Sequence, residues 1–297
     1  MDSKDTFFSD KQSLNCGGRL LQFNPALVMG ILNITPDSFY AGSRYSDPEE
    51  IRKKVTEMVG QGADILDVGA YSSRPGAENV GEDEELERLT KAIPLIREAS
   101  PGILISVDTF RSNVARRVVG DFGIDMINDI SGGGLDTEMF STIARLQVPY
   151  IIMHMKGNPS DMQEHAVYGD VVKEMITYFS EKISRLNQLG VNDIIIDPGF
   201  GFAKTTEHNF EILRQLENFG IFTQPLMVGI SRKSMIYKTL DCSPTEALNG
   251  STVLHTIALM KGASILRVHD VRAAREAVEL VRKTMSTGDP DLHQDAE

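Results

Sequence analysis

The length, composition and charge of the chain exclude several classes of protein. Its 297 residues, of which 41% are hydrophobic and 24% charged, suit a globular protein, and a formal net charge of −12 argues against nucleic-acid binding. No apolar run reaches the roughly 18 residues that span a bilayer, residues 1–12 lack a signal-peptide core, and two distant cysteines, Cys16 and Cys242, favour the reducing cytoplasm.

The chain is patterned between residues 25 and 285, and polar at both ends. Residues 1–24 are weakly patterned, so we expect a loosely attached N-terminal arm, and residues 286–297 form a predicted flexible tail. Between them, short apolar runs are continuous enough for parallel strands buried on both faces. The eight predicted strands lie at residues 27–32, 63–68, 103–107, 125–130, 148–153, 193–196, 225–230 and 264–268.

Helical periodicity fills the segments between these strands. It is clearest at residues 168–189, where apolar side chains line one stripe and charged side chains lie opposite. The other predicted helices cover residues 47–60, 82–99, 112–122, 137–146, 206–219, 244–260 and 271–285. Eight strand-helix units predict an α/β fold of one domain, a (β/α)₈ TIM barrel. An open flavodoxin-like sheet with a second domain is the structural alternative.

Polar or charged side chains follow every predicted strand. In a barrel these strand ends converge on one rim, where active sites are built. Because each buried polar group needs a partner to offset its desolvation, a shared site explains the pattern better than chance loop starts. In chain order, the strand ends carry Asn33, Asp67, Asp108, Asn128 with Asp129, His154, Asp197, Ser231 with Arg232 and Lys233, and Arg267 with His269 and Asp270.

Seven motifs in a fixed order point to a family. They are MGILNITPDSF from Met29, DVGAYSSRPG from Asp67, SVDT from Ser106, INDISGG from Ile127, DPGFGFAK from Asp197, GISRKS from Gly229 and RVHD from Arg267. From residue 27 to residue 285 the chain resembles the dihydropteroate synthase family. The resemblance implies a TIM-barrel transferase, usually a homodimer, that requires Mg²⁺ and is a target of sulfonamides. The implied reaction joins 6-hydroxymethyl-7,8-dihydropterin diphosphate to p-aminobenzoate in folate biosynthesis, and gives 7,8-dihydropteroate and pyrophosphate.

The resemblance also assigns a pterin end to the site. A carboxylate accepts two parallel N–H donors from a pterin edge, and Asp197 matches the family residue with that role. Lys233 matches a lysine that donates to the pterin carbonyl and a ring nitrogen. For Asp108 and Asn128, a purely structural hydrogen-bonded layer is the alternative. The full pterin set is Asp108, Asn128, Met153, Asp197, Phe202, Gly229 and Lys233.

A diphosphate end follows from the same resemblance. Arg267 and His269 are expected on the same side of the eighth strand's end, and they resemble the family's anion-binding pair. Ser72 and Ser73 add hydroxyl donors. Asn33 offers a neutral oxygen to Mg²⁺, and because the sequence supplies no carboxylate cage, the metal should bind weakly without substrate.

Two loops, at residues 35–46 and 71–80, are expected to fold over bound substrate. The predicted p-aminobenzoate and sulfonamide pocket contains Phe39, Arg74, Pro75, Phe202, Ser231, Arg232 and Lys233. The second loop departs from the family pattern Gly-Glu-Ser-Thr-Arg-Pro, because residues 70–75 read Ala-Tyr-Ser-Ser-Arg-Pro. Tyr71 therefore replaces a carboxylate, which leaves loop closure and sulfonamide sensitivity open.

The mechanism implied by the resemblance is a dissociative displacement without a covalent nucleophile. Its catalytic residues are Lys233, Arg267, His269 and Asp108, which support the leaving diphosphate and orient the pterin. Two other functions stay open: a methyltetrahydrofolate-dependent methyltransferase that serves a corrinoid protein, and a non-catalytic pterin-binding protein. The anion-binding residues argue against both, whereas Tyr71 keeps the second one open.

Overall fold

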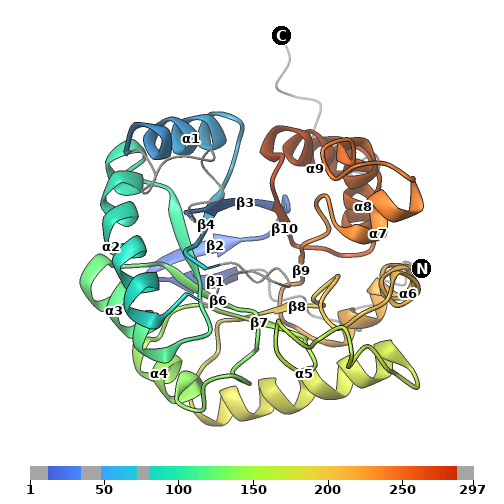
Figure 1. The fold of residues 1–297 in the computed structure, drawn as a ribbon, viewed down its shortest axis with the longest axis horizontal. Coiled ribbons are helices and arrows are strands. Elements are labelled where there is room, and N and C mark those ends of the chain that lie inside the picture. Colours follow the sequence, from blue (N-terminus) through green and yellow to red (C-terminus); the bar gives the residue numbers. More distant parts are fainter. Residues whose placement is uncertain (1–12, 35–47, 72–79, 286–297) are drawn as a thin grey trace, which may run out of the picture.

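The structure is a computed structural model, and it describes residues 13–34, 48–71 and 80–285. Along these residues strands and helices alternate, and a ring of strands is enclosed by helices (Figure 1). Several sequence predictions concern residues outside the described part of the chain. These are the predictions for residues 1–12, the whole first loop at 35–46 with Phe39, Ser72, Ser73, Arg74 and Pro75 in the second loop, and the tail at 286–297.

Eight parallel strands form the predicted barrel. They are hydrogen-bonded in the order β8-β7-β6-β5-β4-β3-β10-β9, and a parallel bridge between Ile196 and Leu226 joins β8 to the segment before β9. Each strand lies inside its predicted run or extends it by one residue. The strands are β3 (Leu27–Asn33), β4 (Ile65–Gly69), β5 (Leu104–Asp108), β6 (Met126–Asp129), β7 (Tyr150–Met153), β8 (Ile194–Asp197), β9 (Met227–Val228) and β10 (Ile265–Val268).

Helices cover the outside of the barrel at the predicted places, with three differences. The helix predicted at 244–260 begins only at Leu248. The helix predicted at 206–219 ends at Arg214 and is followed by the 3₁₀ helix η2 (Leu216–Ile221), and the short α7 was not predicted. The helices are α1 (Pro48–Gly60), α2 (Glu82–Ala99), α3 (Ser112–Phe122), α4 (Met139–Leu146), α5 (Val171–Gln188), α6 (Thr206–Arg214), α7 (Ser234–Thr239), α8 (Leu248–Met260) and α9 (Val271–Met285). None of the helices in the described ranges is both long and apolar enough to span a membrane.

The strands supply two separate cores because their side chains alternate in direction. On β4, Leu66 and Val68 pack against the helices, whereas Ile65 packs inside the barrel. The next inward position is Asp67, two residues beyond Ile65. The same step leads from Met126 to Asn128, from Ile195 to Asp197 and from Ile265 to Arg267. A polar layer therefore lies on the apolar interior layer, towards the carboxyl ends of the strands.

A β-hairpin closes the opposite end of the barrel. It consists of β1 (Ser13–Cys16) and β2 (Arg19–Gln22), and Leu14, Cys16 and Leu21 are buried with the interior core. The loosely attached arm predicted from the sequence is therefore wrong for residues 13–22. Both cysteines are free, and burial raises the pKa of the Cys16 thiol to about 12, which makes this thiol unreactive.

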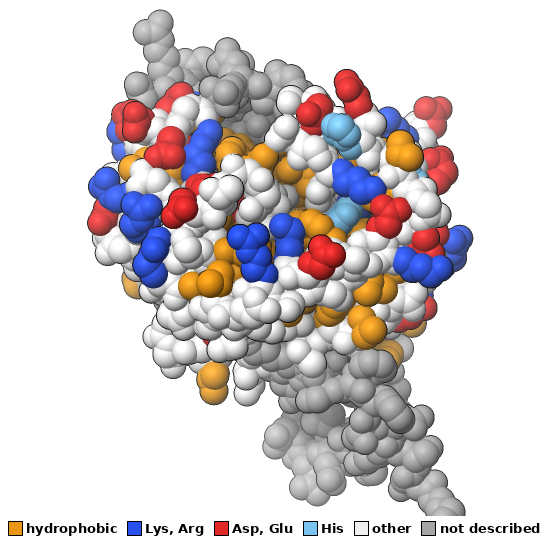
Figure 2. Space-filling model, turned by 90° about the horizontal axis from the view of Figure 1, so that it is seen from below, with side chains coloured by type: hydrophobic (Ala, Val, Ile, Leu, Met, Phe, Trp, Pro, Cys, Tyr) orange, Lys and Arg blue, Asp and Glu red, His pale blue; other side chains and the backbone are white. Residues whose placement is uncertain are grey.

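Surface charges are mixed rather than segregated where the molecule is seen from the side. On the face that carries α5, which lies at the bottom of Figure 1, acidic and basic side chains are interspersed (Figure 2). This face gives no broad basic surface that would attract nucleic acid. Attraction of an anionic ligand then depends on groups concentrated in the barrel mouth.

We expect Leu14→Ala to destabilise the fold, because Leu14 is 1% exposed and fills the barrel end. The loss should be about 2–4 kcal/mol in the free energy of unfolding, measured by urea denaturation. Leu20→Ala is the matched control in the same hairpin, since Leu20 is 67% exposed, and it should change stability by less than about 0.5 kcal/mol. Equal effects of the two substitutions would show that the hairpin does not contribute to the core.

Candidate active site

Arg267 lies at the centre of the polar layer in the barrel mouth. Its Nε donates to Asp67 Oδ2 at 2.6 Å, and its Nη2 donates to Asp108 Oδ2 at 2.8 Å. Asn128 Nδ2 donates to the same oxygen of Asp67 at 2.9 Å. These three contacts join β10, β4, β5 and β6, so four of the strand ends predicted to meet at one rim do meet.

Burial sets the charge balance of this cluster. Burial opposes the charge of Arg267, but Asp67 and Asp108 outweigh it and raise the pKa of the guanidinium above its ordinary value. The pKa of Asp108 is raised to about 7 in total. Burial is the main cause, Asp67 adds to it, and Arg267 acts in the opposite direction. Arg267 is thus always charged, whereas Asp108 changes charge near neutral pH.

Asp197 and Lys233 form a second charged pair in the mouth. Asp197 is buried at the end of β8, where its Oδ1 accepts a hydrogen bond from the Gly199 amide at 2.8 Å. Lys233 Nζ donates to the Phe200 carbonyl and lies 4.7 Å from the centroid of the Phe202 ring. Burial lowers the pKa of Lys233 to about 8, while Asp197 opposes the shift. Burial raises the pKa of Asp197, while Lys233 and Arg267 oppose it.

The loop after β8 is held by a buried lysine that the sequence analysis did not identify. Lys204 Nζ donates to the carbonyls of His154, Gly199 and Phe202 at 3.1, 3.0 and 2.9 Å, and lies 3.0 Å from His154 Nδ1. Burial and Lys204 lower the pKa of His154 to about 2, so its ring is neutral beside the lysine. The one sequence signal for this role is the position of Lys204 at the end of the Gly-rich motif that begins at Asp197.

Gly199 lets this loop pass close to β7. Its φ is +68°, and a Cβ atom there would lie 2.3 Å from the His154 carbonyl oxygen, which no side chain permits. The loop therefore keeps Phe202 in one apolar cluster with Met153. The two apolar walls predicted for the pterin are thus brought together.

The remaining described candidates lie around the same rim. A Cβ atom on Gly69 would lie 3.1 Å from Asn33 Oδ1 and 4.0 Å from Asp108 Oδ2, which places the Asn33 amide beside the charged cluster. A Cβ atom on Gly229 would lie 3.8 Å from Arg267 Cβ, so glycine leaves room next to the guanidinium. All of these residues are positioned by the ends of strands.

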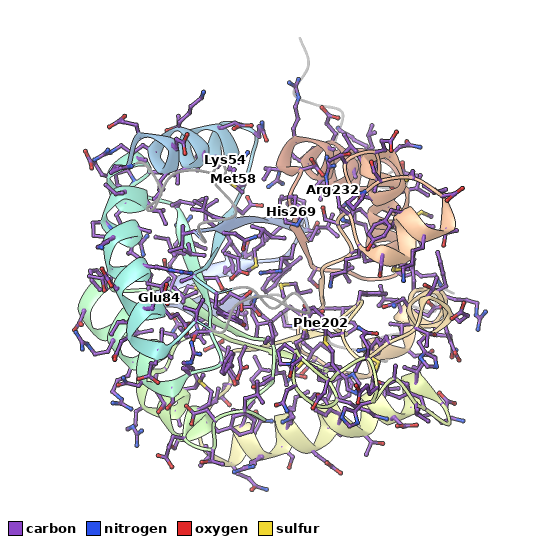
Figure 3. All side chains as sticks on the ribbon, viewed as in Figure 1. Lys54, Met58, Glu84, Phe202, Arg232 and His269 are labelled. Carbon is purple, nitrogen blue, oxygen red and sulfur yellow. The ribbon has the colours of Figure 1, made fainter. Side chains whose placement is uncertain are left out.

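Ser231 and His269 are joined to each other, whereas Arg232 turns to the outside. Ser231 Oγ accepts from the His269 amide at 3.2 Å, and His269 is exposed just beyond β10. Arg232 Nε and Nη2 donate to the two oxygens of Asp270 at 2.8 and 2.9 Å, and its Nη1 donates to the Thr245 carbonyl at 2.7 Å. Figure 3 shows His269 and Arg232 near the end of β10, with Phe202 across the opening.

Comparison with known proteins agrees with this geometry. The model of the family described as pterin binding enzyme matches residues 29–269. The dihydropteroate synthase of Escherichia coli K12 is 41% identical over 91% of this chain and 95% of its own length, and that of Synechocystis is 45% identical over 83% and 86%. This chain belongs to the dihydropteroate synthase family.

Solved structures of the family share the fold as well as the sequence. Yersinia pestis dihydropteroate synthase, crystallised as a sulfonamide drug complex, superimposes with a TM-score of 0.85 at 36% identity, over 92% of this chain and 99% of that chain. The Thermus thermophilus dihydropteroate synthase, solved in complex with 4-aminobenzoate, gives 0.81 at 36% identity, over 91% and 99%. The TIM barrel and the transferase class predicted from the motifs are therefore confirmed.

The pKa values of Asp108 and Lys233 predict a bell-shaped pH dependence of kcat/KM. Activity should fall towards low pH as Asp108 gains a proton near pH 7, and towards high pH as Lys233 loses one near pH 8. The measurement is steady-state pyrophosphate release across about pH 5 to 10.

A variant separates Lys233 from other sources of the alkaline limb. Arginine does not lose its proton in this range, so the residual activity of Lys233→Arg should have no alkaline limb. Persistence of that limb in the variant would exclude Lys233 as its source.

Proposed function

We propose that this dihydropteroate synthase homologue condenses 6-hydroxymethyl-7,8-dihydropterin diphosphate with p-aminobenzoate, and that the described mouth binds both ends of the diphosphate substrate. Carboxylates and cations lie together in one opening, and this arrangement supports the proposed reaction. Arg267 contacts Asp67 and Asp108, and it acts electrostatically on Asp197 and Lys233 as well. A pterin needs carboxylates for its N–H donors, and a diphosphate needs cations. The mouth offers both.

The pterin is proposed to lie between the two walls of the mouth. Asp197 would accept two N–H donors of the pterin edge, and Lys233 would donate to its carbonyl. Both oxygens of Asp197 have acceptor capacity left, because the only hydrogen bond described for this carboxylate is the Gly199 amide to Oδ1. Asp108 and Asn128 would bind from the opposite wall, with Met153, Phe202 and Gly229 around the ring.

The diphosphate is proposed to leave from the side of β10 and β3. Arg267 keeps N–H groups beyond those on Asp67 and Asp108, and exposed His269 and the Asn33 amide stand at the same rim. These groups would stabilise charge on the departing diphosphate. Ser72 and Ser73 would complete this end. The reaction breaks the carbon–oxygen bond to the diphosphate first, and the amine of p-aminobenzoate then attacks the pterin methylene and loses its proton.

The p-aminobenzoate pocket is proposed next to Lys233 and Phe202. The ammonium of Lys233 lies over the Phe202 ring, 4.7 Å from its centroid. Ser231 lies at the same strand end. The remaining proposed members are Phe39, Arg74, Pro75 and Arg232, of which Arg232 is engaged by Asp270.

Mg²⁺ is proposed to bind together with the diphosphate, through Asn33. In the described ranges no group of three His, Cys, Asp or Glu side chains is arranged for a metal, and the mouth carboxylates Asp67 and Asp108 contact Arg267. One amide oxygen fits an ion that keeps waters and takes phosphate oxygens as its other ligands. Bound there, Mg²⁺ would neutralise charge on the diphosphate.

We expect Asp197→Ala and Lys233→Ala each to lower turnover by about 100-fold or more, because each removes a charged group that orients the pterin. The assay is pyrophosphate release that depends on both substrates. Lys238→Ala is the matched control, since Lys238 is exposed on α7, five positions beyond Lys233, and it should leave turnover near normal. Near-normal rates in both site variants would overturn the assignment.

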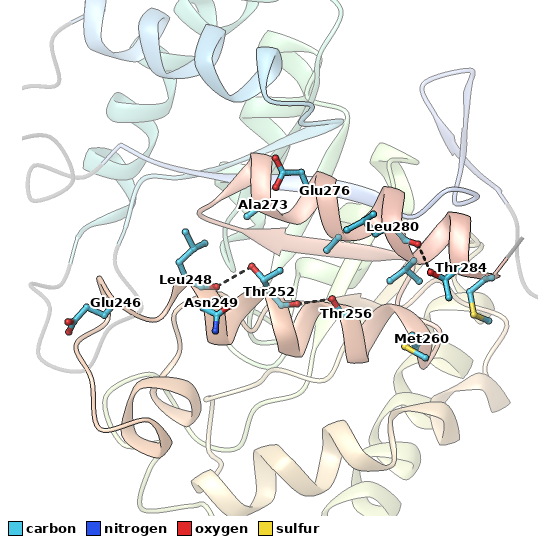
Figure 4. A pocket seen from close by; sticks show the side chains of 13 residues that line it. Glu246, Leu248, Asn249, Thr252, Thr256, Met260, Ala273, Glu276, Leu280 and Thr284 are labelled. Atoms are coloured by element: carbon cyan, nitrogen blue, oxygen red, sulfur yellow. Dashed lines mark hydrogen bonds between the residues drawn. The ribbon is translucent and has the colours of Figure 1, made fainter. Parts of the chain in front are cut away.

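A homodimer is proposed through the groove between α8 and α9. This groove has a volume of about 800 Å³, and both apolar and polar side chains line it (Figure 4). Leu248, Met260, Leu280 and Met285 are among its lining residues and are exposed. Exposed large apolar side chains gathered in one groove are typical of an interface, and a second copy of the chain would bury them by two-fold symmetry.

We expect sedimentation to give twice the chain mass of 32.8 kDa, and Leu280→Glu to shift the species to the monomer. Leu189→Glu is the matched control, because Leu189 is also an exposed leucine but lies at the end of α5. A monomeric wild-type chain, or a dimer that resists Leu280→Glu, would contradict this interface.

A cytoplasmic location is proposed from the cysteines. Cys16 and Cys242 are both free, and Cys16 is buried in the hairpin core. Free thiols of this kind are usual in a reducing compartment.

A further inference from the structure

Tyr71 lies two residues beyond the end of β4, and its contact with Asp108 has no part in the roles proposed above. Its hydroxyl donates to Asp108 Oδ1 at 3.0 Å. Its ring meets the ring of Phe110 edge to face, with 5.3 Å between the centroids. We propose that Tyr71 is a positioning residue, which orients the Asp108 carboxylate for the pterin and keeps it ionised. This inference rests on the proposed function, because it assumes that Asp108 contacts the pterin.

The two oxygens of Asp108 are held by donors from different parts of the barrel. Tyr71 binds Oδ1, and Arg267 Nη2 binds Oδ2 at 2.8 Å. The torsion that turns a carboxylate is broad, so one contact alone leaves the carboxylate free to rotate. With both donors in place, its plane is fixed and each oxygen keeps a lone pair for a ligand N–H.

The charged groups around Asp108 are mostly negative, so a neutral hydrogen-bond donor helps to stabilise its ionised carboxylate. Asp108 faces Arg267 from β10, Asp67 from β4 and Glu85 from α2, so two further carboxylates oppose its charge and one guanidinium supports it. The hydrogen bond from Tyr71 favours the ionised form without adding a positive charge that would compete for the substrate.

The phenol itself stays protonated in this environment. Burial raises the pKa of Tyr71 well above its ordinary value, and Asp108 raises it further. Tyr71 is therefore only a donor to Asp108 over the range in which the enzyme is assayed. Loss of the hydroxyl removes the donor and should raise the pKa of Asp108.

The ring contact allows a substitution that removes the hydroxyl and little else. In Tyr71→Phe the edge-to-face contact with Phe110 is retained, together with the apolar cluster that contains Phe202 and Met153. The ring of Phe110 is also covered on one side by Arg111, at 4.8 Å from the guanidinium carbon to the centroid, so it keeps its place.

The test compares pH profiles of kcat/KM for 6-hydroxymethyl-7,8-dihydropterin diphosphate. In Tyr71→Phe we expect the acid limb to move up by about one pH unit, which is about a tenfold loss on the acid side. KM for the pterin diphosphate should rise at every pH, whereas KM for p-aminobenzoate should stay unchanged. An unmoved acid limb together with an unchanged pterin KM would overturn the proposal.

Tyr150→Phe is the matched control for loss of a buried hydroxyl. Tyr150 OH donates to Asp129 Oδ2 at 2.6 Å, so the same kind of bond is removed from a carboxylate that holds the Gly-rich loop after β6. This variant should lose thermal stability but keep the acid limb at its wild-type pH. The same shift in both variants would assign the effect to general loosening.

A second variant tests whether the effect of Tyr71→Phe comes from loss of the hydroxyl rather than from misfolding. Tyr71→Met also lacks the hydroxyl and fills irregular space by its flexibility, so it should reproduce the shift of Tyr71→Phe. A shift in only one of the two variants would count against the hydroxyl as the cause. Wild-type enzyme without turnover would refute the proposed function instead, since the inference concerns only the difference between wild type and variants.

Discussion

The guanidinium of Arg267 between Asp67 and Asp108 is the interaction on which the mouth depends. In the sheet, β3 lies between β10 and β4, so the arginine crosses the opening rather than joining neighbouring strands. Asp67 is fully buried, and a buried carboxylate without a partner costs several kcal/mol. The two carboxylates therefore require Arg267 where it is, and the arginine in turn fixes the spacing of the strand ends that carry them.

The opposite wall is held mainly by hydrogen bonds to backbone carbonyls. Lys204 holds the loop after β8 through three carbonyls and the neutral ring of His154, and Gly199 permits the close approach to β7. That loop supplies the Phe200 carbonyl to which Lys233 donates. The lysine proposed to bind the pterin is thus oriented by backbone, and burial lowers its pKa, a shift that Asp197 opposes and Arg267 reinforces. One wall is rigid through charge pairing, and the other through backbone geometry.

The sequence predicted the strands and their polar ends because both follow from local rules. Continuous apolar runs gave the eight strands, and a period of two places Asp197 and Arg267 beyond interior residues. The same period of two places Asp67 beyond the interior residue Ile65. Its contact with Arg267 could not be predicted, because it depends on how far the arginine side chain reaches across the opening. The hairpin was missed because each of its strands has only four residues, and β2 buries only one of them. Arg232 and Lys233 are adjacent in the motif, and only their contacts, with Asp270 and with the Phe200 carbonyl respectively, show how the two side chains differ.

The mouth reconciles an anionic substrate with a chain of net charge −12. Asp67, Asp108 and Asp197 outnumber Arg267 and Lys233, so the cations alone do not give the opening a positive charge. Neutral donors leave this count of charges unchanged: Asn128 stabilises Asp67 and Tyr71 stabilises Asp108 without adding a cation. Pterin N–H groups would act in the same way on Asp108 and Asp197. Because these donors occupy no N–H group of Arg267, the arginine can contact Asp67 and Asp108 and still donate to the diphosphate, so the pterin end and the diphosphate end of the site meet at Arg267.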